Sequence, residues 1–208
     1  LAFFVLMTAG FSQYDPELTN LQPVLKSYWL VIHVAIITIS YGFFGLGFIL
    51  SLINLIISVF RNDKNQKRLT LLIKELTHIN EMTLIIGIAM ATIGTFLGGV
   101  WANESWGRYW GWDQKETWAL AIVMCYGFVL HFRLIPGLRG LIAFNNGSLW
   151  GFGSVIMTFV GVNYYLSKGL HSYAAGDTPA FPSWIWGMLA GLFILSIAAA
   201  IIDKKLKN

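Results

Sequence analysis

The chain alternates between long stretches without charged residues and short connections that carry its Lys, Arg, Asp and Glu. The five long uncharged stretches are residues 27–60, 82–103, 117–132, 140–167 and 178–202. A helix crosses the hydrocarbon core of a bilayer with about 20 residues. The pattern therefore predicts five complete transmembrane helices. The third extends past Arg133 to Ile135, because a terminal arginine can reach the headgroups.

The chain begins with Leu rather than Met, and its first uncharged stretch, Leu1 to Tyr14, is short for a span. We therefore expect Leu1 to Phe11 to be the remnant of a further, truncated N-terminal helix. The connections leave no room for a soluble domain, so residues 1–208 are predicted to form a single membrane domain.

Small residues recur at four-residue spacing and should permit close helix contact. These pairs are Gly94 and Gly98, Gly147 and Gly151, and Gly187 and Gly191.

Composition supports this pattern. The chain is 56% hydrophobic and 12% charged, whereas soluble domains carry about 25% charged residues. The apolar excess must face lipid, which predicts an all-α integral membrane protein, a polytopic helix bundle in a lipid bilayer. A single cysteine, Cys125, excludes an internal disulfide and a C-x-x-C-H haem attachment site, so the chain is not itself a c-type cytochrome.

Lys and Arg are unequally divided between alternate connections. One set, including the C-terminus, carries ten of them and the other set carries four. By the positive-inside rule the first set is cytoplasmic. Residues 101–118, which join the second and third spans, should then lie on the external face, as should the connection that holds His171.

The four histidines differ in predicted depth. His33 lies near the external end of the first span, and His171 lies on that same side. His131 follows Thr117 by fourteen residues, about 21 Å down the helix in the cytoplasmic half. Ionisable groups inside spans suggest function. The alternative for His33 and His131 is a structural role, in which the imidazole hydrogen-bonds to a carbonyl of a neighbouring helix. The alternative for His171 is an ordinary surface histidine. His78 lies among charges and is expected to be a plain surface residue.

The segment 101–118 holds five of the nine tryptophans, namely Trp101, Trp106, Trp110, Trp112 and Trp118. Interfacial belts explain one or two at each helix end. If the segment is helical, Trp106 and Trp110 share a face and form a flat aromatic shelf for a large planar ligand. Arg108 or Lys115 would face anionic groups of that ligand, or both would be solvated cations. Asp113 is expected to cap the next helix.

Trp106-Gly107-x-x-Trp110-x-Trp112-Asp113 resembles the WWD signature of haem-handling proteins of cytochrome c biogenesis. The sequences WDQKETW at 112–118 and GLHSYA at 169–174 resemble the CcsA/ResC type of System II more than the CcmC or CcmF types. The resemblance runs from about Leu21 to the C-terminus. One departure is Gln114, where the family pattern has Pro.

The resemblance implies that haem b is bound on the external face, with His33 and His171 as axial ligands of its iron. His131 would serve an inner haem site whose second ligand comes from a CcsB/ResB-type membrane subunit. Further haem contacts are expected at the five tryptophans of the segment, at Asp113 and at Arg108.

The reaction implied is attachment of haem vinyl groups to the two thiols of a CXXCH apocytochrome c. The chain would position haem within a holocytochrome c synthase complex rather than supply a nucleophile. Its expected location is the bacterial cytoplasmic membrane or an equivalent energy-transducing membrane, with the C-terminus cytoplasmic and no nucleic-acid partner. The alternatives are a haem transporter or chaperone without synthase activity, of the CcmC type, and a structural membrane subunit with an interfacial tryptophan belt.

Overall fold

A computed structural model describes residues 27–166 and 180–206, and within these ranges all regular structure is helical. The α-helices are α2 (Tyr28–Val59), α3 (Gln66–Trp106), α4 (Gln114–Leu130), α5 (Leu141–Ile156) and α6 (Trp184–Lys205). A 3₁₀ turn, Phe132–Leu134, follows α4, and a π-helix, Met157–Tyr165, continues α5. Leu1 to Phe11, the expected helix remnant, lies outside the described residues.

The all-helical membrane architecture predicted from the uncharged stretches is confirmed. Three helices, α2, α3 and α6, are long and apolar enough to cross a membrane. The remaining two stretches form α4, of 17 residues, and α5, of 16 residues with a nine-residue π continuation. The count of five complete spans therefore stays a prediction.

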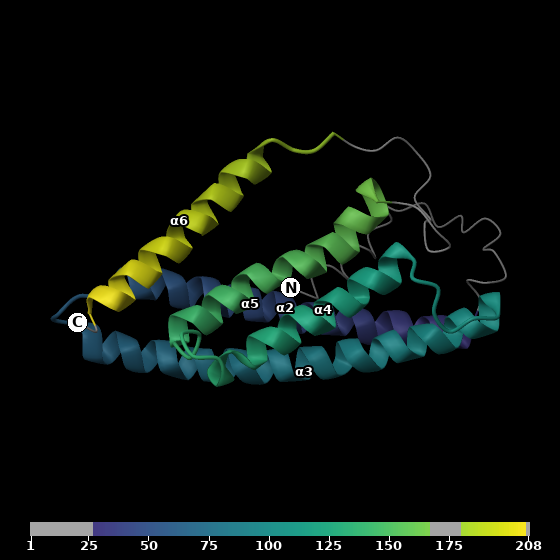
Figure 1. The fold of residues 1–208 in the computed structure, drawn as a ribbon, viewed down its shortest axis with the longest axis horizontal. Coiled ribbons are helices and arrows are strands. Elements are labelled where there is room, and N and C mark those ends of the chain that lie inside the picture. Colours follow the sequence, from purple (N-terminus) through teal and green to yellow (C-terminus); the bar gives the residue numbers. More distant parts are fainter. Residues whose placement is uncertain (1–26, 167–179, 207–208) are drawn as a thin grey trace, which may run out of the picture.

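The connection expected between the first two spans is largely helical. α3 begins at Gln66, sixteen residues before the uncharged stretch that starts at Met82. Its 41 residues give a helix about 61 Å long, the longest element in Figure 1. The Lys, Arg, Glu and Leu residues of this segment are good helix formers, so the chain continues as helix beyond the apolar part.

Glycines let the two longest helices approach closely. A Cβ atom on Gly94 of α3 would lie 3.3 Å from the backbone nitrogen of Ile37 on α2. On the α4–α5 side, Gly147 faces Phe132 and Gly151 faces Tyr126. Two of the three predicted glycine pairs therefore lie at helix contacts. For Gly187 and Gly191 of α6, an added Cβ would meet no described atom within 4 Å.

A buried polar cluster joins α2, α3 and α5. Asn54 Nδ2 donates to Asn145 Oδ1 at 2.9 Å, and Asn145 Nδ2 donates to Thr77 Oγ1 at 2.7 Å. Asn80 Nδ2 donates to Ser51 Oγ at 2.8 Å. In a membrane bundle each interhelical hydrogen bond of this kind contributes about 0.6 to 2 kcal/mol. The cluster thus fixes the relative register of α2, α3 and α5, and α2 and α3 line the site described next.

Candidate functional site

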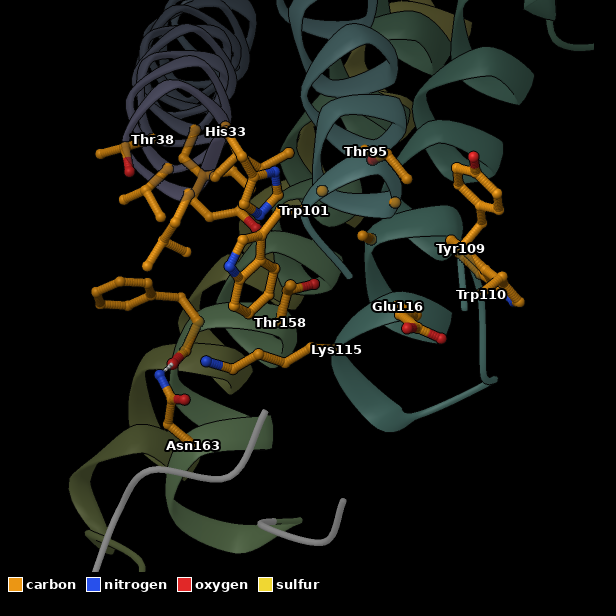
Figure 2. Close-up of a pocket in the computed structure, with 18 residues that line it drawn as sticks. His33, Thr38, Thr95, Trp101, Tyr109, Trp110, Lys115, Glu116, Thr158 and Asn163 are labelled. Carbon is orange, nitrogen blue, oxygen red and sulfur yellow. Dashed lines mark hydrogen bonds between the residues drawn. The ribbon is translucent and has the colours of Figure 1, made fainter. Parts of the chain in front are cut away.

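A pocket of about 230 Å³ lies where the first part of α2 meets the last part of α3 and the start of α4 (Figure 2). Part of the π-helix completes its wall. The lining includes Leu30, His33, Ile37, Tyr41, Thr95, Gly98, Gly99, Trp101, Tyr109, Trp110, Lys115, Glu116, Ala119, Thr158, Phe159 and Asn163. Two predicted groups, the first-span histidine and the tryptophan-rich segment, therefore meet at one pocket.

Three residues of α3 lie against the His33 ring. Its Nδ1 lies 2.7 Å from the carbonyl oxygen of Gly94. A carbonyl can only accept, so Nδ1 carries the proton and the Nε2 of the neutral ring carries the lone pair. The ring also stacks with Trp101 at a centroid separation of 6.4 Å and an interplanar angle of 7°. Gly98 leaves the necessary space, since a Cβ there would lie 2.6 Å from His33 Cε1.

This hydrogen bond fits both interpretations that the sequence left open for His33. A carbonyl of a neighbouring helix does satisfy the imidazole, as the structural alternative requires. Metal-binding histidines make the same bond, because donation from one ring nitrogen to a backbone carbonyl orients the other nitrogen and raises its basicity. The position of the ring at a pocket, rather than in packed core, favours the binding role.

The tryptophan-rich segment is not one helix, so the predicted helical shelf of Trp106 and Trp110 is wrong. α3 ends at Trp106 because Gly107 takes a left-handed conformation with φ of 71°. Residues 107–113 form a loop, in which Trp112 also has a positive φ of 57°. The rings meet mostly edge to face: Trp110 and Trp112 lie 5.6 Å apart at 87°.

The five tryptophans have different surroundings. Trp101 is 1% exposed and contacts Trp106 edge to face at 4.8 Å. Trp118 is half-buried on α4, and its carbonyl oxygen accepts from Thr158 at 3.3 Å. Trp112 is 69% exposed, whereas Trp101 and Trp110 line the pocket. Of the five tryptophans, only Trp101 and Trp110 therefore line the pocket, and Trp106 is in contact with Trp101.

Trp110 contributes an unused polar group. Its indole nitrogen Nε1 is buried and donates to no atom of the residues described. Buried donors of this kind are rare and call for an explanation, such as a ligand or water that accepts the proton. The donor belongs to a lining residue, so it fits a ligand with acceptor groups.

Asp113 caps α4, as predicted. Its carboxylate accepts from the backbone nitrogen of Glu116 at 2.9 Å, and Glu116 accepts in turn from the backbone nitrogens of Asp113 and Gly111 at 3.2 and 2.7 Å. Glu116 thus fixes the end of the 107–113 loop. It was not predicted from the sequence as a positioning residue, although the Asp-x-x-Glu spacing is typical of a capping box. Gln114 is the first residue of α4, a position that suits proline equally well, so this departure from the family pattern leaves the start of α4 in place.

The two cations of the segment lie differently. The Arg108 guanidinium lies directly against Gly111, in the space that a Cβ of that residue would take, and Arg108 is not part of the lining. Lys115 lines the pocket, and burial lowers its pKa, an effect that the nearby Asp113 carboxylate partly offsets. Of the two cations that the sequence offered as contacts for anionic groups, Lys115 therefore lines the pocket and Arg108 does not.

The other histidines lie apart from His33 or outside the structure. His131 caps the C-terminal end of α4, is exposed, and its Nδ1 lies 2.6 Å from the Gly127 carbonyl oxygen. His78 is exposed, 3.9 Å from Glu81, as expected for a surface residue. His171 lies in residues 167–179, outside the described ranges, so its pairing with His33 stays a prediction. Among the residues described, no three His, Cys, Asp or Glu are grouped to hold a metal ion.

The fold and the pocket define a polytopic helical membrane protein with an imidazole and two indoles at one end of its bundle. Residues 1–171 match the family model described as Cytochrome C assembly protein. The chain belongs to the cytochrome c assembly protein family, and it is of the CcsA type, which confirms the resemblance found in its sequence.

The similar proteins include two CcsA proteins and one NrfI. The cytochrome c biogenesis protein CcsA of Cyanophora paradoxa is 33% identical over 198 residues, which cover 76% of this chain and 61% of that protein. CcsA of Chlamydomonas reinhardtii is 39% identical over 162 residues, 76% of this chain and 44% of that one. Protein NrfI of Wolinella succinogenes is 51% identical over 177 residues, 85% of this chain and 19% of that one. The chain thus spans between about a fifth and three fifths of these relatives.

Family membership supports a role in cytochrome c maturation, together with haem handling and an integral membrane location.

Proposed function

We propose that this chain binds haem b at the pocket beside His33 and presents it on the external face of the membrane to the CXXCH thiols of apocytochrome c. It acts as one subunit of a holocytochrome c synthase complex with a CcsB/ResB-type partner. The observation that carries the proposal is the His33 imidazole, oriented by the Gly94 carbonyl and Trp101 at the wall of a pocket.

The residues present fit a haem. Neutral imidazole is the commonest nitrogen ligand of haem iron, and the proton on His33 Nδ1 leaves Nε2 as the basic nitrogen of the ring. The Trp110 Nε1–H and the Lys115 ammonium offer a hydrogen-bond donor and a positive charge to carboxylates such as propionates. Trp101 and Trp106 provide aromatic surface beside the imidazole.

The small size of the pocket agrees with a role in presenting haem to an apocytochrome. Its volume of about 230 Å³ is below the roughly 300–1,000 Å³ of pockets that enclose a drug-sized ligand. The described residues would therefore hold one edge of a macrocycle and leave the rest accessible. Bound haem supplies vinyl groups to which thiols add. The contribution of this chain is to orient that edge and keep the iron ligated until the substrate histidine replaces a protein imidazole.

Several finer parts of the proposal concern residues or partners beyond this pocket. His171 is proposed as the second axial ligand of the outer haem. His131, exposed at the far end of α4, is proposed to serve an inner haem with a ligand from the partner subunit. The five uncharged stretches are proposed to span the membrane, with the His33 end external and the C-terminus cytoplasmic.

Alanine variants of His33 and His171 test the assignment in the purified complex. Each should abolish or weaken the absorption spectrum of a bis-imidazole haem, whereas the exposed control His78→Ala should leave it intact. An unchanged spectrum in both variants contradicts the assignment.

Expression with an apocytochrome and a CcsB-type partner distinguishes the remaining functions. Thioether-linked haem supports the synthase, and release of non-covalent haem supports a transporter. A structural subunit predicts no haem on purification.

A further inference from the structure

A second recess lies at the opposite end of the bundle from His33. Its volume is about 330 Å³, and it forms where the α2–α3 connection meets the start of α5 and the end of α6. Figure 1 shows the α2–α3 connection and the C-terminal end of α6 together at this end. The recess is separate from the pocket of the proposed function, since the two share no residue.

A buried arginine forms one wall of the recess. Arg61 is 8% exposed, and its Nη2 donates to Asp203 Oδ1 at 2.7 Å and to Ser58 Oγ at 2.9 Å. Its Nε is buried and donates to no atom of the residues described. A buried guanidinium donor left unsatisfied is costly, so an acceptor is expected in the recess. Asp203 balances the charge of Arg61, and Arg139 on the same lining adds a second positive charge.

The start of α5 forms another wall. Its N-cap is Gly140, which provides no side-chain cap, and no acidic residue stands in the first turn. Leu141 and Ile142, at the first two helical positions, line the recess. Backbone N–H groups at a helix N-terminus attract anions, and here they face the same space as the two arginines. Two independent features, the uncapped helix and the unsatisfied Arg61 nitrogen, therefore favour one kind of ligand, an anion.

An adjoining groove continues from the recess along α5 and α6. It has a volume of about 560 Å³, and Arg139, Gly140, Ile142 and Asp203 line both spaces. Further along, its walls are the small apolar side chains of Ala143 and Ala200, with Lys204 near the charged end. The groove also contains Asn146, whose Oδ1 is buried and accepts no hydrogen bond from the residues described. The combined space thus has charged residues at one end and continues between the apolar side chains of Ile142, Ala143 and Ala200.

We infer that this space binds an anionic phospholipid. The Arg139 guanidinium, the Arg61 Nε–H and the first backbone N–H groups of α5 hold the phosphate. The glycerol backbone and the acyl chains continue from the phosphate along Ile142, Ala143 and Ala200. Basic pockets between transmembrane helices recognise lipid headgroups in this way. The apolar groove favours a lipid over free phosphate, because inorganic phosphate has no part that would fill it.

Lipid-dependent thermal stabilisation tests the inference, with the full chain purified in a neutral detergent. Phosphatidylglycerol should raise the unfolding midpoint of the wild type, and phosphatidylcholine should not. Arg139→Gln should bind phosphatidylglycerol about fivefold more weakly, equivalent to about 1 kcal/mol for one arginine near the headgroups. The matched control is Arg68→Gln, which removes an exposed arginine of α3 at the same end of the bundle and outside the recess. It should respond as the wild type does.

The comparison uses the shift caused by lipid, so a variant that is less stable without lipid is still informative. An equal shift in Arg139→Gln and wild type overturns the site. If inorganic phosphate alone produces the whole shift, the ligand is a soluble anion and the assignment to a phospholipid is wrong. Equal stabilisation by phosphatidylcholine overturns the role of negative charge.

Discussion

Replacing Gly98 by Ala should disturb haem binding by displacing the His33 ring. The new Cβ would lie 2.6 Å from His33 Cε1, 2.8 Å from Nδ1 and 3.2 Å from Nε2. Ordinary contact begins at 3.4 Å, so the ring must move by about 0.8 Å or α3 must withdraw. Such movement lengthens the 2.7 Å hydrogen bond to Gly94 and tilts the ring away from Trp101.

The expected magnitude follows from two effects. Overpacking of this kind costs about 1 to 3 kcal/mol, and loss of the hydrogen bond that orients a metal-binding histidine weakens binding by about 10- to 100-fold. Alanine is the better helix former, so a loss cannot be attributed to helix propensity. The assay is optical titration of the purified complex with haem, which gives the apparent Kd and the spectrum of the bound form.

Gly42→Ala is the matched control, because Gly42 lies on α2 like His33 and a Cβ there meets nothing within 4 Å. It should bind haem as the wild type does. The reasoning is refuted if Gly98→Ala binds haem with an affinity within about twofold of the control and with the same spectrum.

Three further changes separate stability from binding. Trp110→Phe keeps an aromatic ring but removes the buried, unpartnered Nε1–H, so the unfolding midpoint should not change and the haem affinity in the optical titration should fall. An affinity equal to that of the wild type would show that Trp110 does not contact haem. Asp113→Ala removes the cap of α4 and should lower the free energy of unfolding by about 1 kcal/mol, with Asp113→Ser retaining most of it; denaturation of both variants checks this. Asn145→Ala removes the hydrogen bonds to Asn54 and Thr77 and should lower the free energy of unfolding, measured by denaturation, by about 1 to 2 kcal/mol. An unchanged free energy of unfolding would show that the buried cluster does not hold the three helices together.

The uncharged stretches of the sequence predicted where the helices lie, because a helix that faces lipid needs about 20 residues without charge. It misplaced the start of α3, where charged residues remain helical outside the apolar part. Capping by Asp113 was predictable because it depends on local spacing, Asp followed three residues later by Glu.

The candidate site was predictable in its residue types and less so in its geometry. Periodicity suggested a helical shelf through Trp106 and Trp110, but one left-handed glycine, Gly107, ends the helix between them. The pairing of His33 with Gly94 and Gly98 depends on how α2 and α3 pack, which spacing within one helix does not determine. The same holds for the buried asparagines, which are far apart in sequence and meet only in the bundle.

The most direct test of the central claim replaces the proposed iron ligand and then restores it from solution. The complex is purified with His33→Gly, and absorption spectra of its bound haem are recorded with and without added imidazole. The account predicts that the bis-imidazole spectrum is lost in the variant and returns when imidazole is added. The reason is that glycine at position 33 leaves space for free imidazole beside Trp101. An unchanged spectrum without imidazole would show that His33 does not bind the iron.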